Sequence, residues 1–311
     1  MEITLFKVLP FFLIALAGYL AARFRYLSEN LFDGLAQFVF AVALPVYLFR
    51  TLARTGLLDK SAGNLVEFLA IYFLAAAGAL LIGMLVARFA FNASSGEQTR
   101  MGVSGAQSNL VLLGIPAVVL ILDSQVLTPM LLLVGLHGLV MALIVLVVQR
   151  VQSGRGSDPF KMAIDYAKSP LFIALVAGIL FAKLDIKIPA KIDTALQTVA
   201  VTAVPCALFA FGGTLVRHSF GDRLQPEFAI AAVKLAAFPL LVWLIAIKLK
   251  LLSIPPSWAW VAVMLAAMPA GFEWHGKGKR GGGEVSGATV MVSTLAGVIS
   301  ITVLTHIIRT A

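Results

Sequence analysis

The sequence predicts an all-α polytopic membrane protein, with ten transmembrane helices arranged as two inverted five-helix repeats. Composition, segment length and an internal repeat all indicate this fold class. Of the 311 residues, 60% are hydrophobic and 13% are charged, against about half and about a quarter in a soluble domain. The hydrophobic residues form blocks of about 20, the length that an α-helix needs to cross the hydrocarbon core.

Ten hydrophobic segments follow one another, separated by short polar loops. The first is longer than a signal-peptide core and is followed by Arg23 and Arg25, so we expect it to be retained. The single cysteine, Cys206, lies inside a segment, which excludes an intrachain disulfide and a cysteine metal site. No cofactor is expected. The predicted helices are 3–22, 31–49, 66–87, 102–121, 128–148, 170–183, 194–216, 227–247, 258–272 and 285–308.

The chain repeats itself after about 160 residues. Pro10–Gly18 (PFFLIALAG) returns as Pro170–Gly178 (PLFIALVAG). The same spacing relates Ala43–Pro45 to Ala203–Pro205, Leu48–Phe49 to Leu208–Phe209, and Glu67–Phe68 to Glu227–Phe228. Because each copy holds five segments, an odd number, the second must lie inverted in the membrane. We therefore predict a first repeat over 1–149, a cytoplasmic linker over 150–169 and a second repeat over 170–311, a frequent plan of secondary transporters.

The distribution of Lys and Arg indicates the orientation. The odd-numbered loops carry thirteen of these residues and the even-numbered loops carry eight. By the positive-inside rule we expect both termini outside the cytoplasm, in an inner (plasma) membrane protein. The net charge of +9 is dispersed in small groups at segment ends, so no nucleic-acid partner is expected.

The fourth segment of each repeat is interrupted. In the first repeat, the polar residues Gln107, Ser108 and Asn109 lie at membrane depth and precede Gly114-Ile-Pro116. In the second repeat, Met268-Pro269-Ala-Gly271 stands at the corresponding position. Proline removes a backbone donor and clashes with the preceding turn, so we expect each helix to open at its proline.

Interrupted segments at matched positions of two repeats point to a substrate-binding site at the midplane. We therefore expect Gln107, Ser108 and Asn109 to contact the substrate. A purely structural reading remains open, because Gly and Pro are common in transmembrane helices and Ser or Asn often only bridges neighbouring helices.

At Asn109–Pro116 (NLVLLGIP) the chain resembles the auxin efflux carrier family, including bacterial members described as malate or malonate carriers. Three further stretches are similar to the second, seventh and ninth segments of that family: Phe40–Pro45, Val204–Leu215 and Met268–Ala270. The resemblance covers nearly the whole chain, in the right order and spacing.

This resemblance implies that segments four and nine cross near their prolines, with the substrate bound beside the crossing. It places Asn109, Gly114, Pro116 and Pro269 at that site. It also implies small organic anions such as malonate or malate as substrates, and an elevator-like movement of a crossover domain against a scaffold. A coupling proton or sodium ion, and assembly as a homodimer, stay open.

After Pro269 the chain departs from the family pattern. The stretch from Gly271 to Glu284 is rich in glycine and contains Lys277, Lys279 and Arg280, whereas the family continues as a helix. Glycine weakens a helix, and these charges are expensive in lipid. Either the second half-helix is lost, which would inactivate this copy, or the coding sequence carries a local frame error, which we favour.

Two polar residues elsewhere in the segments are candidates for proton relay or support. His137 can serve in a proton relay because the unperturbed pKa of a histidine lies near physiological pH, or it can pack in the bundle. Lys234 can support the transport domain, or its stem can extend to the interface. Among other function classes, a sodium-coupled symporter or cation/proton antiporter of the same crossed-helix plan is the main alternative. A membrane-embedded enzyme is disfavoured because the four histidines are scattered.

Overall fold

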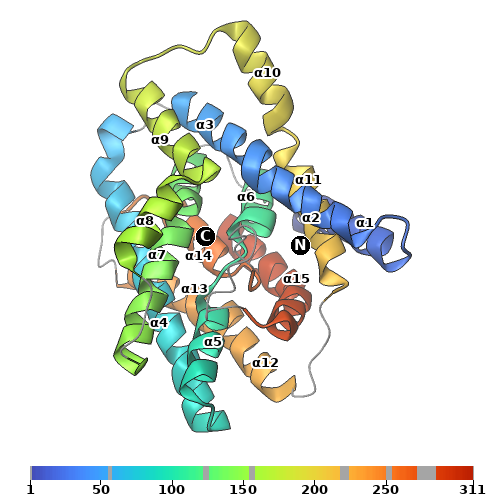
Figure 1. Cartoon of the computed structure of the whole chain (residues 1–311), viewed down its shortest axis with the longest axis vertical. Helices are drawn as coiled ribbons and strands as arrows, with labels where there is room; N and C mark the ends of the chain where they lie inside the picture. Colours follow the sequence, from blue (N-terminus) through green and yellow to red (C-terminus); the bar gives the residue numbers. More distant parts are fainter. Residues whose placement is uncertain are drawn as a thin grey trace.

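The computed structural model describes residues 2–54, 58–121, 126–153, 158–217, 224–249, 254–271 and 285–310. Helices make up almost all of this part of the chain, and its one bridge of β type joins Ser108 to Ala270 (Figure 1). The predicted all-α class is confirmed.

The first half of the chain forms α-helices and two short π-helices, labelled η. They are α1 (Glu2–Arg23), α2 (Glu29–Phe38), η1 (Val39–Ala43), α3 (Leu44–Arg54), α4 (Leu58–Phe91), α5 (Ser95–Ala106), η2 (Leu110–Gly114), α6 (Ile115–Ile121) and α7 (Leu127–Ser153).

The second half repeats this alternation of long and interrupted helices. Its elements are α8 (Pro159–Ala167), α9 (Pro170–Lys183), α10 (Ala190–Ala200), α11 (Ala203–Leu215), α12 (Leu224–Ala232), η4 (Val233–Ala237), α13 (Phe238–Trp243), η5 (Leu244–Lys248), α14 (Pro256–Ala266) and α15 (Gly287–Thr310).

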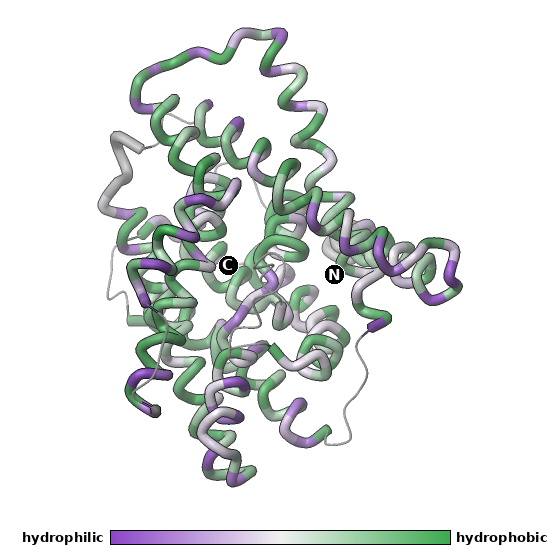
Figure 2. The backbone as a smooth tube through the Cα atoms, viewed as in Figure 1, coloured by the Kyte–Doolittle hydropathy of each residue, from purple (hydrophilic) through white to green (hydrophobic). Residues whose placement is uncertain are grey.

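Six helical stretches in the described residues are long and apolar enough to cross a membrane. They are Glu29–Arg54, Gly63–Phe91, Leu127–Gln152, Ala190–Leu215, Leu224–Lys248 and Gly287–Ile308. The pair α8–α9, bent by 68°, adds a seventh if it counts as one span. Phe12–Arg23, Leu110–Val119 and Pro256–Ala266 are apolar but shorter. Figure 2 shows hydrophobic colour along the helices and hydrophilic colour mainly at their ends. Ten full spans therefore stay a prediction.

Two predicted stretches have a different local structure. The seventh segment, predicted as one helix over 194–216, is interrupted between Ala200 and Ala203. Pro205 lies in the first turn of α11, where its missing N–H costs no helical hydrogen bond. The predicted linker contains the helix α8, which begins there because Asp158 accepts a hydrogen bond from the Phe160 N–H and Pro159 opens the first turn.

Three of the π-helices end two residues before a proline. In a regular α-helix the proline ring clashes with the carbonyl four residues earlier. A wider turn, in which an N–H bonds to the carbonyl five residues back, moves that carbonyl aside and lets the helix continue. The prolines are Pro45, Pro116 and Pro239, and the corresponding bonds are Leu44 N–H to Val39, Ile115 N–H to Leu110 and Phe238 N–H to Val233.

Glycines allow two helix pairs to pack at close range. Helix α1 packs along α11, with Gly18 against the backbone of Phe209. Helix α9 packs along α3, with Gly178 against Phe49 and Leu52. A Cβ on Gly178 would lie 3.1 Å from the Phe49 carbonyl oxygen. In the predicted repeat, Gly18 corresponds to Gly178 and Phe49 corresponds to Phe209, in each case 160 residues later. The two packing contacts are therefore equivalent.

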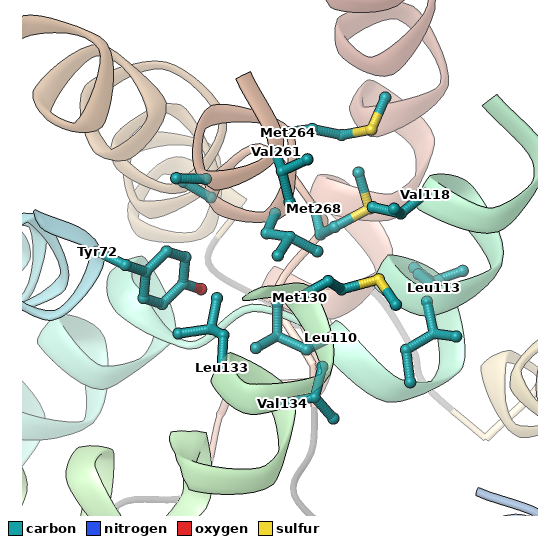
Figure 3. Close-up of a cluster of buried hydrophobic side chains, with 14 of the residues drawn as sticks. Tyr72, Leu110, Leu113, Val118, Met130, Leu133, Val134, Val261, Met264 and Met268 are labelled. Atoms are coloured by element: carbon teal, nitrogen blue, oxygen red, sulfur yellow. The ribbon is translucent and has the colours of Figure 1, made fainter. Parts of the chain in front are cut away.

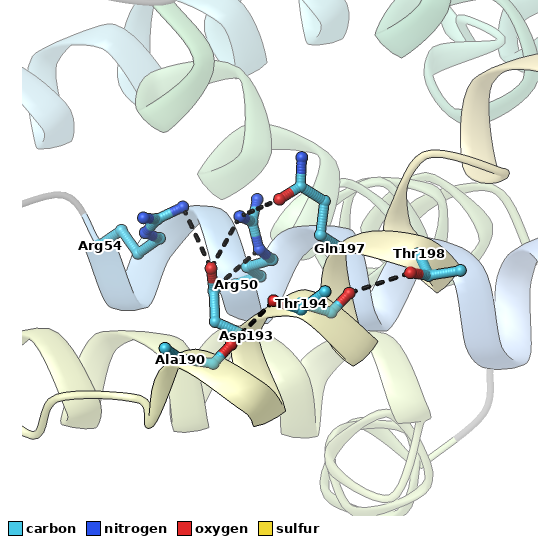
Figure 4. Close-up of polar contacts among 7 residues, drawn as sticks. All are labelled: Arg50, Arg54, Ala190, Asp193, Thr194, Gln197 and Thr198. Carbon is cyan, nitrogen blue, oxygen red and sulfur yellow. Dashed lines mark hydrogen bonds and ion pairs between the residues drawn. The ribbon is translucent and has the colours of Figure 1, made fainter.

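Ion pairs join the two interrupted segments α2–η1–α3 and α10–α11 at both ends. Arg50 of α3 donates from Nε to Asp193 of α10 at 2.8 Å and from Nη2 to Gln197 at 3.0 Å (Figure 4). At the other end, Arg217 donates to the Asp33 carboxylate of α2 at 2.7 and 2.9 Å. Asp33 and Asp193 are again 160 residues apart. Such pairs contribute little stability when exposed, but they fix the alignment of the two segments.

The helices form two groups. The scaffold group comprises α1, α2, η1, α3, α9, α10 and α11, which pack on one another through the contacts just described. The crossing group comprises α4, α5, η2, α6, α12, η4, α13, η5, α14 and α15, in which α4 packs on α5 and α13, α13 on α14, and α12 on α15. Helix α7 contacts members of both groups, and α8 contacts α7 and α9. In the view of Figure 1 the scaffold helices lie mainly above α4, α5 and α12.

Substituting Gly18 by alanine tests the close packing of α1 on α11. A Cβ there would overlap the Phe209 backbone, and overpacking of this kind costs about 1–3 kcal/mol. We expect Gly18→Ala to lower the unfolding temperature in detergent. Gly34→Ala is the matched control, because nothing lies within 4 Å of a Cβ at that position of α2. Equal unfolding temperatures for the two variants would contradict this packing.

Candidate functional site

The C-terminal ends of two interrupted helices, α5 and α14, meet in the crossing group. Helix α5 ends at Ala106 and α14 ends at Ala266, and the extended residues that follow run antiparallel beside one another. The Asn109 N–H donates to the Pro269 carbonyl at 3.0 Å, and Ser108 faces Ala270 in the isolated bridge. We call the residues 107–109 and 268–271 the crossing. The predicted break of both segments, and their contact with each other, are confirmed by this geometry.

The expected position of the first break is wrong. Segment four opens at Gln107–Asn109 and not at its proline, since η2 and α6 form one continuous helix through Pro116. The wide η2 turn accommodates Pro116, with the Gly114 N–H bonded to the Asn109 carbonyl at 2.9 Å. Only Pro269 lies at the crossing itself. Gly114 faces α14, where a Cβ would lie 3.1 Å from Leu265 Cδ2.

Asn109 begins the half-helix formed by η2 and α6. Its side-chain Oδ1 accepts a hydrogen bond from the Leu112 N–H at 3.1 Å, so it caps the first turn. The residue is buried. With Oδ1 engaged, the amide Nδ2 carries two further donors at the N-terminal end of the half-helix. Positive helix-dipole charge and N–H donors therefore coincide at this point of the crossing.

The other two polar residues of the first break are also buried. The Tyr72 hydroxyl of α4 donates to Ser108 Oγ at 3.1 Å, which ties the crossing to the neighbouring long helix. Gln107 follows the last turn of α5, and its N–H donates to the Val103 carbonyl at 2.8 Å. The structure thus brings Gln107, Ser108, Asn109 and Pro269 together as predicted.

Helix α15 holds the second side of the crossing. The Ala270 N–H donates to Ser293 Oγ at 3.0 Å, and Ser293 in turn donates to the Val290 carbonyl at 3.2 Å. Gly297 of α15 faces the Pro269 ring, where a Cβ would lie 2.7 Å from Cγ. The position of Ser293 in a hydrophobic helix gives no sequence signal for this role.

Gly271 packs directly against Asn109. A Cβ on Gly271 would overlap the Asn109 Cβ and lie 2.8 Å from its Cγ. Glycine at this position is therefore needed for Asn109 to occupy its place. The proximity of the two residues was not predictable from sequence spacing, because it arises from the antiparallel crossing.

Lys234 is completely buried in η4. Its Nζ donates to the carbonyl of Ala266, the last residue of α14, and lies 4.7 Å from the centroid of the Phe238 ring. The reading in which its stem reaches the interface is wrong. The side chain instead reaches the C-terminal end of a half-helix, one turn before Pro269.

His137 of α7 is also buried, beside the crossing. Its ring lies edge-to-face with Tyr72, with centroids 5.8 Å apart, and stacks on Phe73 at 6.0 Å. Since Tyr72 bonds to Ser108, one side chain separates His137 from the crossing. The structure supports the packing reading for His137 and leaves a proton-relay role as a prediction.

Buried apolar side chains form a shell beside the crossing, which includes Met268 of the crossing itself. Figure 3 shows this shell, with Tyr72 at one side and its hydroxyl pointing into the cluster. In surroundings of this kind, charges and dipoles interact more strongly than in water, and methionines adapt to groups of different shape. The labelled members are Leu110 and Leu113 of η2, Val118 of α6, Met130, Leu133 and Val134 of α7, and Val261, Met264 and Met268 from α14 and the turn after it.

A surface cavity of about 440 Å³ lies away from the crossing. Arg54, Lys187 and Asp193 line it, between the end of α3 and the α9–α10 connection. None of the residues predicted for substrate binding borders this cavity, so the crossing remains the candidate site. Within the described ranges no cluster of three or more His, Cys, Asp or Glu could hold a metal ion. The stretch 273–283, including Glu273 and His275, falls outside those ranges.

The chain matches the family described as "Membrane transport protein" over residues 3–158 and 159–307. It therefore belongs to this family of transport proteins, the auxin efflux carrier family that its motifs resemble. With its apolar helices, it is an integral membrane transport protein.

A protein of Rhizobium meliloti (strain 1021) named "Putative malonate transporter" is 27% identical over 310 residues. The alignment covers 97% of this chain and 95% of the relative. This full-length similarity extends over both broken segments and the crossing that they form.

A disulfide can test the antiparallel geometry of the crossing. Directly opposed residues of an antiparallel pair have Cα atoms about 4.5–5.5 Å apart, within the range that a disulfide spans. We expect Ser108→Cys with Ala270→Cys to form a bond on oxidation, in a Cys206→Ser background. Either cysteine paired with one at the exposed Asn30 should not, as judged by mass spectrometry of the digested protein. A free thiol at both positions after oxidation would argue against the bridge.

Proposed function

We propose that the protein is a secondary carrier of small organic anions, such as malonate or malate, that works by alternating access around the crossing. The observation that carries this proposal is the buried N-terminal end of the η2–α6 half-helix, capped by Asn109 and held by Pro269. In the interior of a membrane protein such an end is a binding place for a carboxylate.

The charge of the proposed substrate follows from the groups that line this end. The half-helix contributes the positive partial charge of its N-terminal end. Asn109 adds two Nδ2 donors. The apolar shell around them keeps water away and strengthens their interaction with an anion. Fixed donors of this kind bind a carboxylate without a buried arginine.

We infer that the two halves are inverted repeats related by a two-fold axis through the crossing. Packing contacts support this, because Gly18–Phe209 and Gly178–Phe49 exchange under the offset of 160. The two aspartates that pair with an arginine of the opposite half, Asp33 and Asp193, are separated by the same number. Helices α5 and α14 end 160 residues apart, and Asn109 and Pro269, which bond to each other, differ by the same number. The family match also divides at 158/159, inside the predicted linker.

Alternating access then consists of movement of the crossing group against the scaffold group. Extensive packing and ion pairs hold the scaffold segments together, as a fixed frame requires. The crossing group carries the proposed binding residues as one unit through Tyr72, Ser293 and Lys234. The distribution of Lys and Arg supports an orientation with both termini outside the cytoplasm, in the inner membrane that we propose as the location.

Asn109→Asp is the sharpest test of the substrate site. Aspartate caps a helix as well as asparagine does, so the half-helix should remain intact. It removes the Nδ2 donors and adds a negative charge that repels an anion. Since a hydrogen bond to a charged group contributes about 1.5–3 kcal/mol, we expect at least a ~10-fold loss of uptake, measured with radiolabelled malonate in proteoliposomes under imposed pH and potential gradients.

Asn30→Asp is the matched control, because Asn30 is exposed in α2. It should transport like the native protein. Folded native protein that accumulates neither malonate nor malate would refute the substrate proposal. Native-like transport by Asn109→Asp would remove Asn109 from the pathway.

Gly271→Ala tests whether the placement of Asn109 matters for transport. The added Cβ displaces Asn109, so we expect the apparent KM for malonate to rise several-fold. Gly63→Ala, which has nothing within 4 Å of its new Cβ, should keep the native KM. If both variants transport alike, the contact between Gly271 and Asn109 has no role in binding.

A further inference from the structure

Lys234 lies where the C-terminal ends of the two broken helices come together. Its Nζ donates to the Ala266 carbonyl at the end of α14. Its neighbour Val233 packs on the last turn of α5, where a Cβ on Gly105 would lie 3.1 Å from Val233 Cγ1. One residue in the middle of segment eight thus places a basic group at the end of α14 that leads into the crossing.

The two ends of a half-helix attract opposite charges. The last four carbonyls of a helix have no partner within it, and they carry the negative end of the helix dipole. In secondary transporters with broken helices, anionic groups bind at the N-terminal ends, whereas coupling sodium ions bind at C-terminal ends and unwound carbonyls. The Ala266 carbonyl belongs to the second class of site, and an ammonium already occupies it.

The surroundings of Lys234 are suited to a cation. The Phe238 ring offers its face at 4.7 Å, within the range of a cation–π interaction. Among the ion pairs of the described residues, none pairs Lys234 with a carboxylate. The Lys234 amine is therefore held by a helix end and an aromatic face, and both contacts favour its protonated form.

We propose that Lys234 is a resident cation that takes the place of a coupling sodium ion at the crossing. This inference rests on the proposed carrier function and deepens it: transport of the organic anion does not require sodium. A direct salt bridge to the substrate is not part of the proposal, because Lys234 serves the C-terminal end and the substrate binds at the N-terminal end.

Thermal unfolding without substrate tests the cation site independently of transport. We compare the native protein, Lys234→Ala and Lys234→Gln in sodium chloride and in choline chloride. The native Tm should be the same in both salts. Lys234→Ala should have a lower Tm in choline and gain at least about 3 °C in sodium, because a ligand that binds only the folded state raises Tm. Lys248→Ala, exposed at the end of the same segment, should resemble the native protein.

Lys234→Gln covers the case in which the alanine variant does not fold, since glutamine retains a donor for the Ala266 carbonyl. It should respond to sodium in the same direction. A sodium-dependent Tm of the native protein would overturn the proposal. Folded Lys234 variants that are indifferent to sodium would also overturn it, because they would show a merely structural lysine.

Uptake measurements complete the test. Malonate accumulation by the native protein should be unchanged within twofold when choline replaces sodium. A strict requirement for sodium would overturn the role of Lys234. Absence of uptake in both salts would instead refute the proposed function, and the unfolding experiment would still decide whether Lys234 fills a cation site.

Discussion

The rest of the structure depends on satisfying backbone polar groups that are exposed by two helix breaks at membrane depth. Each unpaired N–H or C=O in hydrocarbon costs several kcal/mol. The two breaks are therefore stable only if their exposed backbone groups find hydrogen-bond partners, including each other. The bond from the Asn109 N–H to the Pro269 carbonyl does this directly. Tyr72, Ser293 and Lys234 complete it from three other helices, which ties the crossing group together around one point.

The sequence predicted the helices well, because blocks of about 20 hydrophobic residues are a strong signal. It misplaced the first break because a proline inside a helix can be accommodated by a π turn, as at Pro45, Pro116 and Pro239. It could not decide the environment of Lys234, since the end of α14 that receives the ammonium is contributed by a distant segment. The contact of Gly271 with Asn109 was beyond sequence reasoning for the same reason.

The two halves are similar in the packing of their helices and different in the polar residues at the crossing. Glycine packing and the paired aspartates Asp33 and Asp193 recur at positions 160 residues apart. By contrast, Asn109 corresponds to Pro269, and Lys234 corresponds to Leu74, which is exposed on the outer side of α4. The corresponding helices α5 and α14 end at equivalent positions, Ala106 and Ala266. Differences at a few positions place the capping residue Asn109 after α5 and the basic residue Lys234 at the end of α14.

This division of charge has a consequence for a carrier. An anion at the N-terminal end and an ammonium at the C-terminal end would each be stabilised by the nearest dipole, and each would reduce the field that the other creates across the apolar shell. Burial of a lone charge is costly, whereas a buried charge with a compensating partner nearby costs much less. In the proposed carrier the ammonium would compensate one negative charge of the bound anion.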